Sequence, residues 1–138
     1  VYKRQQISLA KQYCKAANLP IIEADGVEAD DSMGAVARLA TKEGIQAFLC
    51  SSDKDLCQLV DENTFIVHTH KDNQVLKREN VIGKYGITPE QFIDYLAIVG
   101  DTSDNIPGIK GFGPKTAETL LKEYGTLQKL LDKSKGDT

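Results

Sequence analysis

Three short acidic clusters are the residues of this 138-residue sequence whose types and spacing could do chemistry. They are Glu28, Asp30 and Asp31; Asp53 and Asp55; and Asp101 and Asp104. Seven carboxylates gathered at one site repel one another, and they stay ionised together only if cations hold them. Oxygen ligands with no His or Cys among them select Mg²⁺, or Mn²⁺ in its place, over Zn²⁺. More carboxylates than one ion needs indicate two metal ions, whose chemistry would be hydrolysis of a phosphate ester.

Each acidic cluster also has an ordinary structural explanation. Acidic residues in the first turn of a helix are favoured by the helix dipole, which fits Asp30 and Asp31. Asp53 could cap the short helix after it, and Asp101 and Asp104 could form turns. The spacing of the acids alone therefore leaves a metal site and purely structural roles open.

The second pattern is the glycine-rich run at residues 106–117. Glycines let a backbone approach a phosphate closely, and the free amides at the start of a helix can then bind it. Lys110 and Lys115 add positive charge at the same place. The run is typical of a helix-hairpin-helix element, which grips a DNA backbone without reading its bases. The structural alternative is a plain tight turn between two packed helices.

Up to about residue 80 the sequence predicts helices and strands that alternate along the chain. These elements would position the first two acidic clusters. The predicted helices are 6–17, 29–42 with Gly44 as its C-terminal cap, and 54–60; the predicted strands are 20–23, 45–51 and 64–69, with 75–76 returning as a hairpin. The apolar run in the second strand predicts a sheet covered on both faces. The alternation predicts βαβ units and a largely parallel sheet. The first two acidic clusters would then lie at the carboxyl ends of adjacent strands, where such sheets place their sites.

Beyond residue 80 the pattern predicts helices alone. They cover residues 78–85, 89–99 and 114–124 and a last segment after 126, and Thr88 and Pro89 suit the N-cap and first position of the second. The predicted fold class is therefore an α/β portion with a helical portion attached. We expect the chain to divide into a non-native junction at 1–5, an α/β portion at 6–80 and a helical portion at 81–138.

Composition excludes several other classes of protein. Apolar residues make up 41% of the sequence and charged residues 27%, as in ordinary globular proteins, and no apolar run approaches the roughly 18 residues of a membrane span. Three cysteines without a Cys-x-x-Cys pair indicate reduced thiols in a cytoplasmic protein. His68 and His70 could form a metal pair on one strand face, although two such histidines are more often surface residues.

The net charge of −3 argues against a nucleic-acid binder until the distribution of charge is considered. Setting the seven clustered acids aside from the 20 acidic residues leaves 13, against 17 basic residues. Metal ions would neutralise the clustered acids, and DNA would then meet a mildly basic surface.

Three segments, which contain the acidic clusters and the start of the glycine-rich run, resemble the signature blocks of bacterial 5′→3′ exonucleases. These nucleases form the N-terminal domain of DNA polymerase I and are related to the flap endonucleases. The segments are residues 27–31, 52–59 and 100–109, and the similarity runs from about residue 6 to about residue 132. The resemblance implies a PIN-like α/β nuclease core and a helix-three-turn-helix DNA clamp. It also implies a Mg²⁺-dependent enzyme that cuts a 5′ flap or the 5′ end of duplex DNA, in primer removal and repair.

The same resemblance assigns roles to individual residues. Glu28, Asp30 and Asp31 would serve the first metal ion, and Asp53, Asp55, Asp101 and Asp104 the second. The catalytic set would be Asp30, Asp31, Asp53, Asp55 and Asp104. The residues expected to contact DNA are Lys54, Gly108, Ile109, Lys110, Gly111, Gly113, Lys115 and Thr116. Ser103, Ile106 and Ile109 would hold a K⁺ ion. Lys54, inside a metal-site motif, would contact a phosphate or a carboxylate.

The family's further site aspartates and its basic helical arch would precede residue 1, so we expect these residues alone to bind DNA without cutting it. A monomer in the bacterial cytoplasm, associated with the nucleoid and without a membrane partner, is implied. A DNA-binding module without chemistry is the first alternative. A PIN-type ribonuclease is the second, disfavoured because an A-form RNA duplex differs in its grooves and backbone.

Overall fold

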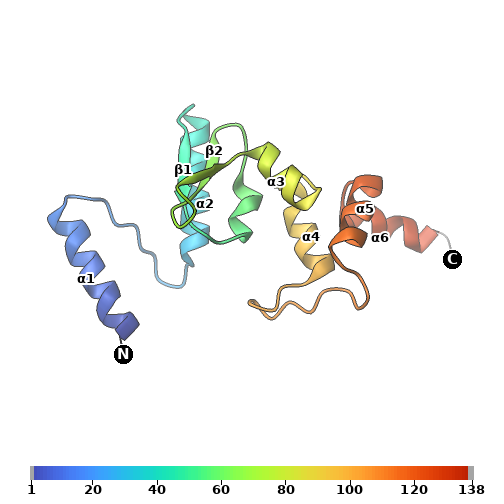
Figure 1. The fold of residues 1–138 in the computed structure, drawn as a ribbon, viewed down its shortest axis with the longest axis horizontal. Helices are drawn as coiled ribbons and strands as arrows, with labels where there is room; N and C mark the ends of the chain where they lie inside the picture. The colour runs from blue at the N-terminus through green and yellow to red at the C-terminus, as the bar shows by residue number, and fades with distance from the viewer. Residues whose placement is uncertain (1, 137–138) are drawn as a thin grey trace. The chain divides into compact units, whose positions relative to one another are not determined.

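The structure, a computed structural model, describes residues 2–136. It forms two compact units, Val1–Val36 and Ala37–Thr138. Figure 1 shows the helices α1 (Tyr2–Ala16), α2 (Ala29–Lys42), α3 (Arg78–Tyr85), α4 (Phe92–Val99), α5 (Pro114–Tyr124) and α6 (Leu127–Gly136). The strands are β1 (Ala47–Cys50), β2 (Thr64–His68) and β3 (Gln74–Leu76), and short 3₁₀ helices cover Asp55–Leu59 and Pro89–Gln91.

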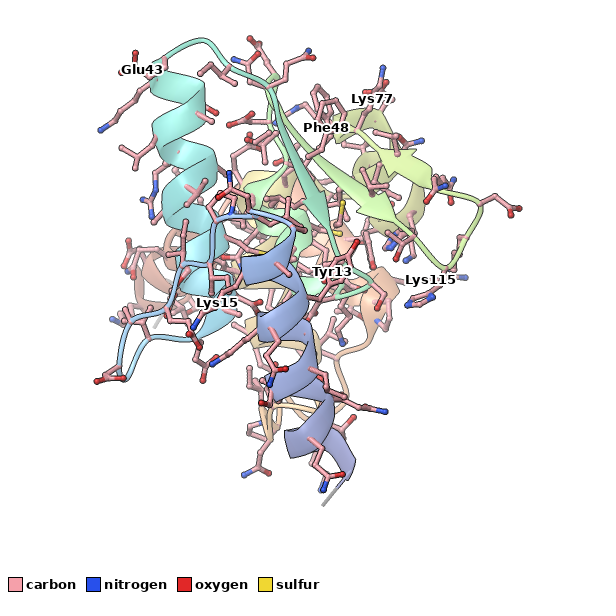
Figure 2. The ribbon with its side chains drawn as sticks, turned by 90° about the vertical axis from the view of Figure 1, so that its left-hand side faces the viewer. Tyr13, Lys15, Glu43, Phe48, Lys77 and Lys115 are labelled. Atoms are coloured by element: carbon pink, nitrogen blue, oxygen red, sulfur yellow. The ribbon has the colours of Figure 1, made fainter. Side chains whose placement is uncertain are left out.

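In the first unit the predicted helix at 6–17 is confirmed as α1, and the predicted strand at 20–23 is wrong. Pro20 has no N–H to donate, and the segment pairs with no strand among the described residues. Its side chains are exposed, as are Ile7, Leu9 and Tyr13 of α1 (Figure 2 labels Tyr13). Of the predicted junction at 1–5, Val1 lies outside the described residues and residues 2–5 are helical, so the junction stays a prediction.

The sheet of the second unit has three strands in the order β1-β2-β3. Strand β1 pairs parallel with β2, with Ala47 opposite Thr64, and β3 pairs antiparallel with β2, with Val75 opposite Val67. The predicted hairpin is thus confirmed. The prediction of a largely parallel sheet is corrected to a small mixed sheet, because the tight turn after β2 can return the chain only in the antiparallel direction.

Strand β1 is not covered on both faces, contrary to the prediction from its apolar run. Leu49 is buried, whereas Phe48 is 54% exposed (Figure 2). The ring of Phe48 lies against that of Phe65 on β2, with centroids 5.2 Å apart. The apolar run of β1 therefore has a different cause: one face of the strand carries the ring that contacts Phe65, and the other face packs in the core.

The helical portion packs on a cluster of aromatic rings. Tyr85 ends α3 and meets Phe92 and Tyr95 of α4 edge to face, with centroids 5.0 and 5.9 Å away. Ala117 and Leu121 of α5 are buried as well. The predicted helix at 89–99 begins as the short 3₁₀ helix and continues as α4.

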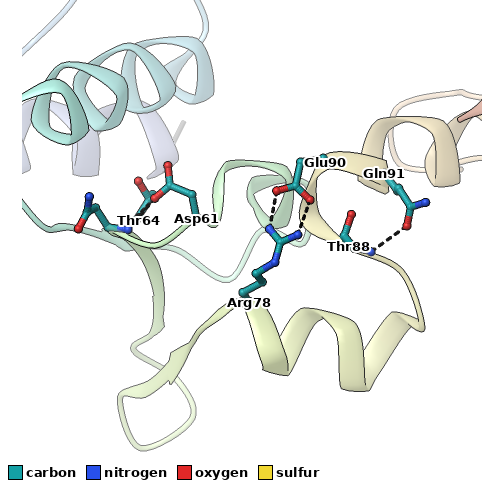
Figure 3. A network of polar contacts seen from close by, with 7 residues as sticks. Asp61, Thr64, Arg78, Thr88, Glu90 and Gln91 are labelled. Carbon is teal, nitrogen blue, oxygen red and sulfur yellow. Dashed lines mark hydrogen bonds and ion pairs between the residues drawn. The ribbon is translucent and has the colours of Figure 1, made fainter. Parts of the chain in front are cut away.

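Polar contacts fix the ends of these helices, as Figure 3 shows. The amide of Thr88 donates to Oε1 of Gln91 at 3.0 Å, which confirms the predicted N-terminal cap region. Nε2 of Gln91 donates to the carbonyl oxygens of Leu121 and Gly125 at 2.9 and 2.8 Å. Arg78 pairs with both carboxylate oxygens of Glu90 and lowers the pKa of Glu90 to about 2. These contacts tie α3, α4 and α5 together.

The three cysteines are free thiols: Cys57 is buried, Cys14 is half-buried and Cys50 is exposed. Within residues 2–136, no helix combines the length and the apolar character that crossing a membrane requires.

Candidate metal centre

The segment after β1 brings two carboxylates into a tight turn. Ser51 Oγ accepts the amide of Asp53 at 3.1 Å, and Asp53 Oδ1 accepts the amide of Asp55 at 3.0 Å. Asp53 therefore forms a turn before the 3₁₀ helix Asp55–Leu59, but it is not the N-cap that the sequence suggested, because Lys54 is in that position. Because the helix begins there, the side chain of Asp55 is half-buried rather than free in solvent.

The loop after α4 carries Asp101 and Asp104, the other two predicted site carboxylates of the second unit. We call the place where the two ends of this loop meet its neck. The main chains of Asp101 and Ile106 exchange two hydrogen bonds, 2.9 and 2.7 Å long. Gly100 and Gly108 cross beneath this pair with φ of +86° and +65°. A Cβ on Gly108 would lie 2.6 Å from the amide nitrogen of Gly100 and 2.5 Å from the carbonyl oxygen of Val99. The neck of the loop therefore requires glycine at both positions.

Carboxylate oxygens of Asp55, Asp101 and Asp104 all lie within 4.8 Å of one another. They open onto a hollow of about 340 Å³, which Asp53 and Lys54 also line. The structure thus brings together three of the seven predicted carboxylates and sets a fourth beside them.

Lys54 makes an ion pair inside this cluster. Its Nζ lies 2.5 Å from Oδ2 of Asp101, whose side chain is 2% exposed. Asp101 also accepts the amide of Ser103 at 2.8 Å. Lys54 and Ser103 lower the pKa of Asp101, and Asp101 in turn raises the pKa of Lys54. Of the two contacts predicted for Lys54, a carboxylate is the one the structure contains.

The carboxyl of Asp55 is in the opposite electrostatic situation. Burial, a hydrogen bond with Asp104 and the charges of Asp53 and Asp101 raise its pKa to about 6, against a smaller opposing effect of Lys54. Like charges in a partly desolvated place disfavour the ionised form in this way.

The donor set of the cluster fits a hard divalent cation. Oδ1 of Asp55 is buried and has no hydrogen-bond donor in the described structure, whereas Oδ2 of Asp101, which is buried as well, contacts the ammonium of Lys54. Buried anionic oxygens without donors are costly, and a cation is the usual means of satisfying them. All three clustered groups offer oxygen, which favours Mg²⁺ or Mn²⁺.

Glu28, Asp30 and Asp31 lie at the start of α2, in the first unit. All three are exposed, and the amide of Ser32 donates to the carbonyl oxygen of Glu28 at 3.2 Å. Asp30 and Asp31 lie in the first turn of α2 and Glu28 directly precedes the helix, which agrees with the structural role that the helix dipole allows. Their convergence with the carboxylates of the second unit stays a prediction.

The glycine-rich run forms the connection between α4 and α5. Ile109 donates its amide to the carbonyl oxygen of Ile98 at 2.8 Å and accepts the amide of Phe112 at 2.9 Å. Gly111 has φ of +86°, and Gly113 is the extended residue before Pro114. The lysines and Thr116 of the run are exposed. A helix start with exposed amides and lysines is thus present where the sequence predicted one.

Two features of this region were missed by sequence reasoning. Gly100 is as necessary to the neck as Gly108, and its position directly before an acidic cluster was the available signal. The second feature is a small basic hollow lined by His68, Lys71 and Lys84. These residues come from separate elements, so their spacing in the sequence carried no signal.

Comparison with known proteins gives a consistent result. The family described as 5'-3' exonuclease, N-terminal resolvase-like domain, matches residues 3–86, and 5'-3' exonuclease, C-terminal SAM fold, matches residues 87–138. A 5'-3' exonuclease of Aquifex aeolicus is 44% identical over 126 residues, covering 91% of this chain and 43% of that protein. A DNA polymerase I of Rhizobium leguminosarum is 46% identical over 129 residues, covering 94% of this chain and 13% of that protein. The chain therefore spans less than half the length of these relatives.

Two solved structures are similar to the chain as well. A bacteriophage T5 protein co-crystallized with metal ions has a TM-score of 0.83 and 25% identity, with 95% of this chain and 50% of that chain covered. A bacteriophage T5 flap endonuclease in a complex with DNA and metal ions has a TM-score of 0.80 and 27% identity, with 89% and 45% covered.

Proposed function

Because the chain belongs to the 5'-3' exonuclease family, we propose that it is part of a metal-dependent nuclease that hydrolyses DNA phosphodiesters. Its substrate would be a 5′ flap or the 5′ end of a duplex, in primer removal and repair, either alone or joined to a polymerase. A monomer in the bacterial cytoplasm fits this work. In finer terms we propose a PIN-like core and a helix-three-turn-helix clamp.

The observation that carries this proposal is the carboxylate cluster beside the glycine-rich connection. Asp55, Asp101 and Asp104 offer oxygens within 4.8 Å of one another, and the buried Oδ1 of Asp55 lacks a donor. Asp101 and Asp104 stand in the loop that opens the connection from α4 to α5. One continuous segment would therefore serve both the metal and the DNA.

The carboxylates would hold Mg²⁺, or Mn²⁺ in its place, as two ions. Asp53, Asp55, Asp101 and Asp104 would serve one, and Glu28, Asp30 and Asp31 the other. When bound, such ions polarise the phosphodiester and activate a water molecule. Asp101 keeps its negative charge through Lys54 and Ser103 and so remains available as a ligand. Lys54 itself would be available to a substrate phosphate whenever a cation takes its place on Asp101.

The connection between α4 and α5 would hold the backbone of the uncut strand. The N-terminal amides of α5 have no partners within the helix and favour an anion. The proposed DNA contacts are Gly108, Ile109, Lys110, Gly111, Gly113, Lys115 and Thr116. Ser103, Ile106 and Ile109 would hold K⁺. The carbonyl oxygens of Ile106 and Ile109 each accept one backbone hydrogen bond, which leaves a lone pair on each for the ion.

A 5′-labelled flap duplex tests the proposal with the purified chain. Binding is measured by anisotropy in Ca²⁺, and cleavage is measured in Mg²⁺ with and without EDTA. The Asp104→Asn variant tests the cluster, and Asp132→Asn in α6 is the matched control, because it removes one exposed carboxylate outside the site.

Cleavage that EDTA and Asp104→Asn abolish, and that Asp132→Asn leaves unchanged, would support a working metal centre in this chain. Flap binding in Ca²⁺ without cleavage is the result we expect, and it would support the DNA clamp. A folded chain that neither binds nor cuts the flap would contradict the proposal.

A further inference from the structure

A second hollow adjoins the hollow of the carboxylate cluster. It encloses about 100 Å³ and shares Ser52 and Lys54 with the hollow of the metal centre. Its lining residues are Ser52, Lys54, Cys57, His68, His70, Lys71, Lys84 and Tyr85. None of these is acidic, so this hollow has the opposite electrostatic character to its neighbour.

Two of the lysines in this hollow have no carboxylate partner. Lys71, in the turn after β2, and Lys84, near the end of α3, belong to none of the ion pairs found among the described residues. The ammonium of Lys84 lies 4.7 Å from the ring centroid of Tyr85. A cation–π contact of this kind restrains the ammonium and leaves its N–H donors available.

Two lining residues of the hollow are held by packing. Tyr85 is packed edge to face against Phe92 and Tyr95, and Cys57 is buried. The imidazoles of His68 and His70 add further N–H donors to the lining. Ammonium and imidazole donors beside packed groups suit an anion.

The hollow also continues toward α5. Lys84 and Tyr85 line a further hollow, of about 420 Å³, whose other lining includes Lys115 and the ion pair of Lys122 with Glu118. Lys84 and Lys115, which belong to no ion pair found among the described residues, therefore lead from the first hollow to the start of α5, where Lys115 is labelled in Figure 2.

We propose that the hollow lined by Lys71 and Lys84 binds one phosphate group of a DNA strand that runs between the metal centre and the start of α5. The proposal rests on the proposed nuclease function. A volume of about 100 Å³ is well below the roughly 300 Å³ at which pockets begin to enclose whole small molecules, so it suits a single group rather than a nucleotide. Phosphate is the anion that DNA offers at every step, and lysine binds it as a point charge.

The experiment compares flap-duplex binding by the wild-type chain, by the double variant Lys71→Gln/Lys84→Gln and by the control Lys129→Gln, in Ca²⁺ over a series of salt concentrations. Lys129 is an exposed lysine of α6 that lines none of these hollows. Each phosphate contact contributes about 0.9 to the slope of log affinity against log salt. We expect the double variant to lose about tenfold in affinity and to reduce that slope by about 1, because one phosphate contact is lost, with the control unchanged.

A phosphate in this hollow has two sources, a DNA strand or a released mononucleotide. A second series therefore measures competition by a deoxynucleoside 5′-monophosphate. If the double variant keeps its affinity and salt slope for the flap but loses sensitivity to the monophosphate, the strand assignment is overturned.

The outcomes also separate this inference from the proposed function. A wild-type chain that binds the flap, together with a folded double variant whose affinity and slope match it, would overturn the phosphate site and leave the nuclease proposal intact. A folded wild-type chain that binds no DNA would overturn both. Circular dichroism of each variant establishes that it is folded, and the Lys71→Arg/Lys84→Arg variant is expected to restore the slope.

Discussion

At the scale of single residues, Asp55 and Asp101 respond in opposite ways to one crowded place. Lys54 and the Ser103 amide keep Asp101 charged, whereas burial and three neighbouring carboxylates oppose the charge on Asp55. A cation bound between them would remove the opposition, and this dependence distinguishes a metal centre from a set of turn-forming acids.

We expect the Asp55→Asn variant to stabilise the metal-free chain at neutral pH. The pKa of Asp55 is raised from 3.8 to about 6, so the folded state binds the proton more tightly than the unfolded state does. Folding stability from this group is therefore present at low pH and lost as pH rises through about 4 to 6. The variant should be more stable than wild type by about 1 kcal/mol at pH 7 and should lose this advantage at pH 4. Urea unfolding in EDTA at both pH values measures the difference.

Mn²⁺ titration of the same Asp55→Asn protein is the second half of this test. The substitution removes a proposed metal ligand together with the repulsion between carboxylates. Mn²⁺ affinity should therefore fall while the free energy of unfolding in EDTA rises. A variant that is both less stable in EDTA at pH 7 and unchanged in Mn²⁺ affinity would contradict the electrostatic account. Asp132→Asn again serves as the control.

Sequence spacing predicted that acids of the second unit would lie near one another but not how they are held. The order of Asp53, Asp55, Asp101 and Asp104 indicated a common site, and three of them do meet. For Lys54 the sequence left two contacts open, a phosphate and a carboxylate, because a lysine contacts whichever anion the fold brings near it. The basic hollow was not predictable, since its lysines meet only through the β2–β3 turn and α3.

At the scale of elements, the helices were predictable where caps and periodicity agreed. Helix α2 and its Gly44 cap, and α5 after Pro114, have the predicted bounds. The predicted strand at 20–23 was wrong, because apolar residues alone do not supply a hydrogen-bonding partner. The prediction that both faces of β1 are covered was wrong, because Phe48 packs beside Phe65 instead of under a helix.

The loop between α4 and α5 gives a prediction at this scale. Replacement of Gly108 by Ala should destabilise the chain by about 2–4 kcal/mol, since its Cβ would meet the main chain of Val99 and Gly100 at a positive φ. Gly111→Ala is the matched control: its φ is also positive, but no atom lies within 4 Å of its Cβ. It should cost about 1 kcal/mol. Urea denaturation compares the two.

A further readout identifies the cause of any loss in Gly108→Ala. Because the neck positions Asp101, Mn²⁺ affinity should fall in Gly108→Ala and remain near wild type in Gly111→Ala. Equal destabilisation of the two variants would show that backbone strain alone, without the close approach, explains the glycine at 108.

At the scale of the whole molecule, the buried apolar residues are unevenly distributed along the chain. Every buried apolar side chain of the described residues lies between Ala37 and Leu121, in the second unit. The first unit exposes Ile7, Tyr13 and Ile22. Hydropathy patterns predicted amphipathic elements in both units, but a pattern shows which face is apolar and not whether another element covers it.

Hydrogen exchange should reflect this distribution. Amides of α1 should exchange at least about 100-fold faster than those of β2 and α4, because local opening there uncovers little buried surface. Mass spectrometry of peptic fragments after timed exchange measures it, with Ile66 and Ile98 as the protected references. Comparable protection of α1 and β2 would mean that the first unit has a stabilising contact of its own that burial does not reveal.

The neck formed by Gly100 and Gly108 makes the loop between them a closed ring whose shape depends on the main chain. Its two hydrogen bonds join the backbones of Asp101 and Ile106, and Thr102, Ser103 and Asn105 are exposed. Between the two ends of the ring, Asp104 belongs to the carboxylate cluster and Asn105 has a positive φ of 58°, so the exposed Thr102 is the position where the side chain should vary in type without moving Asp101. For protein engineering, residues 100–108 are therefore a unit to transplant with the neck intact and to diversify at Thr102.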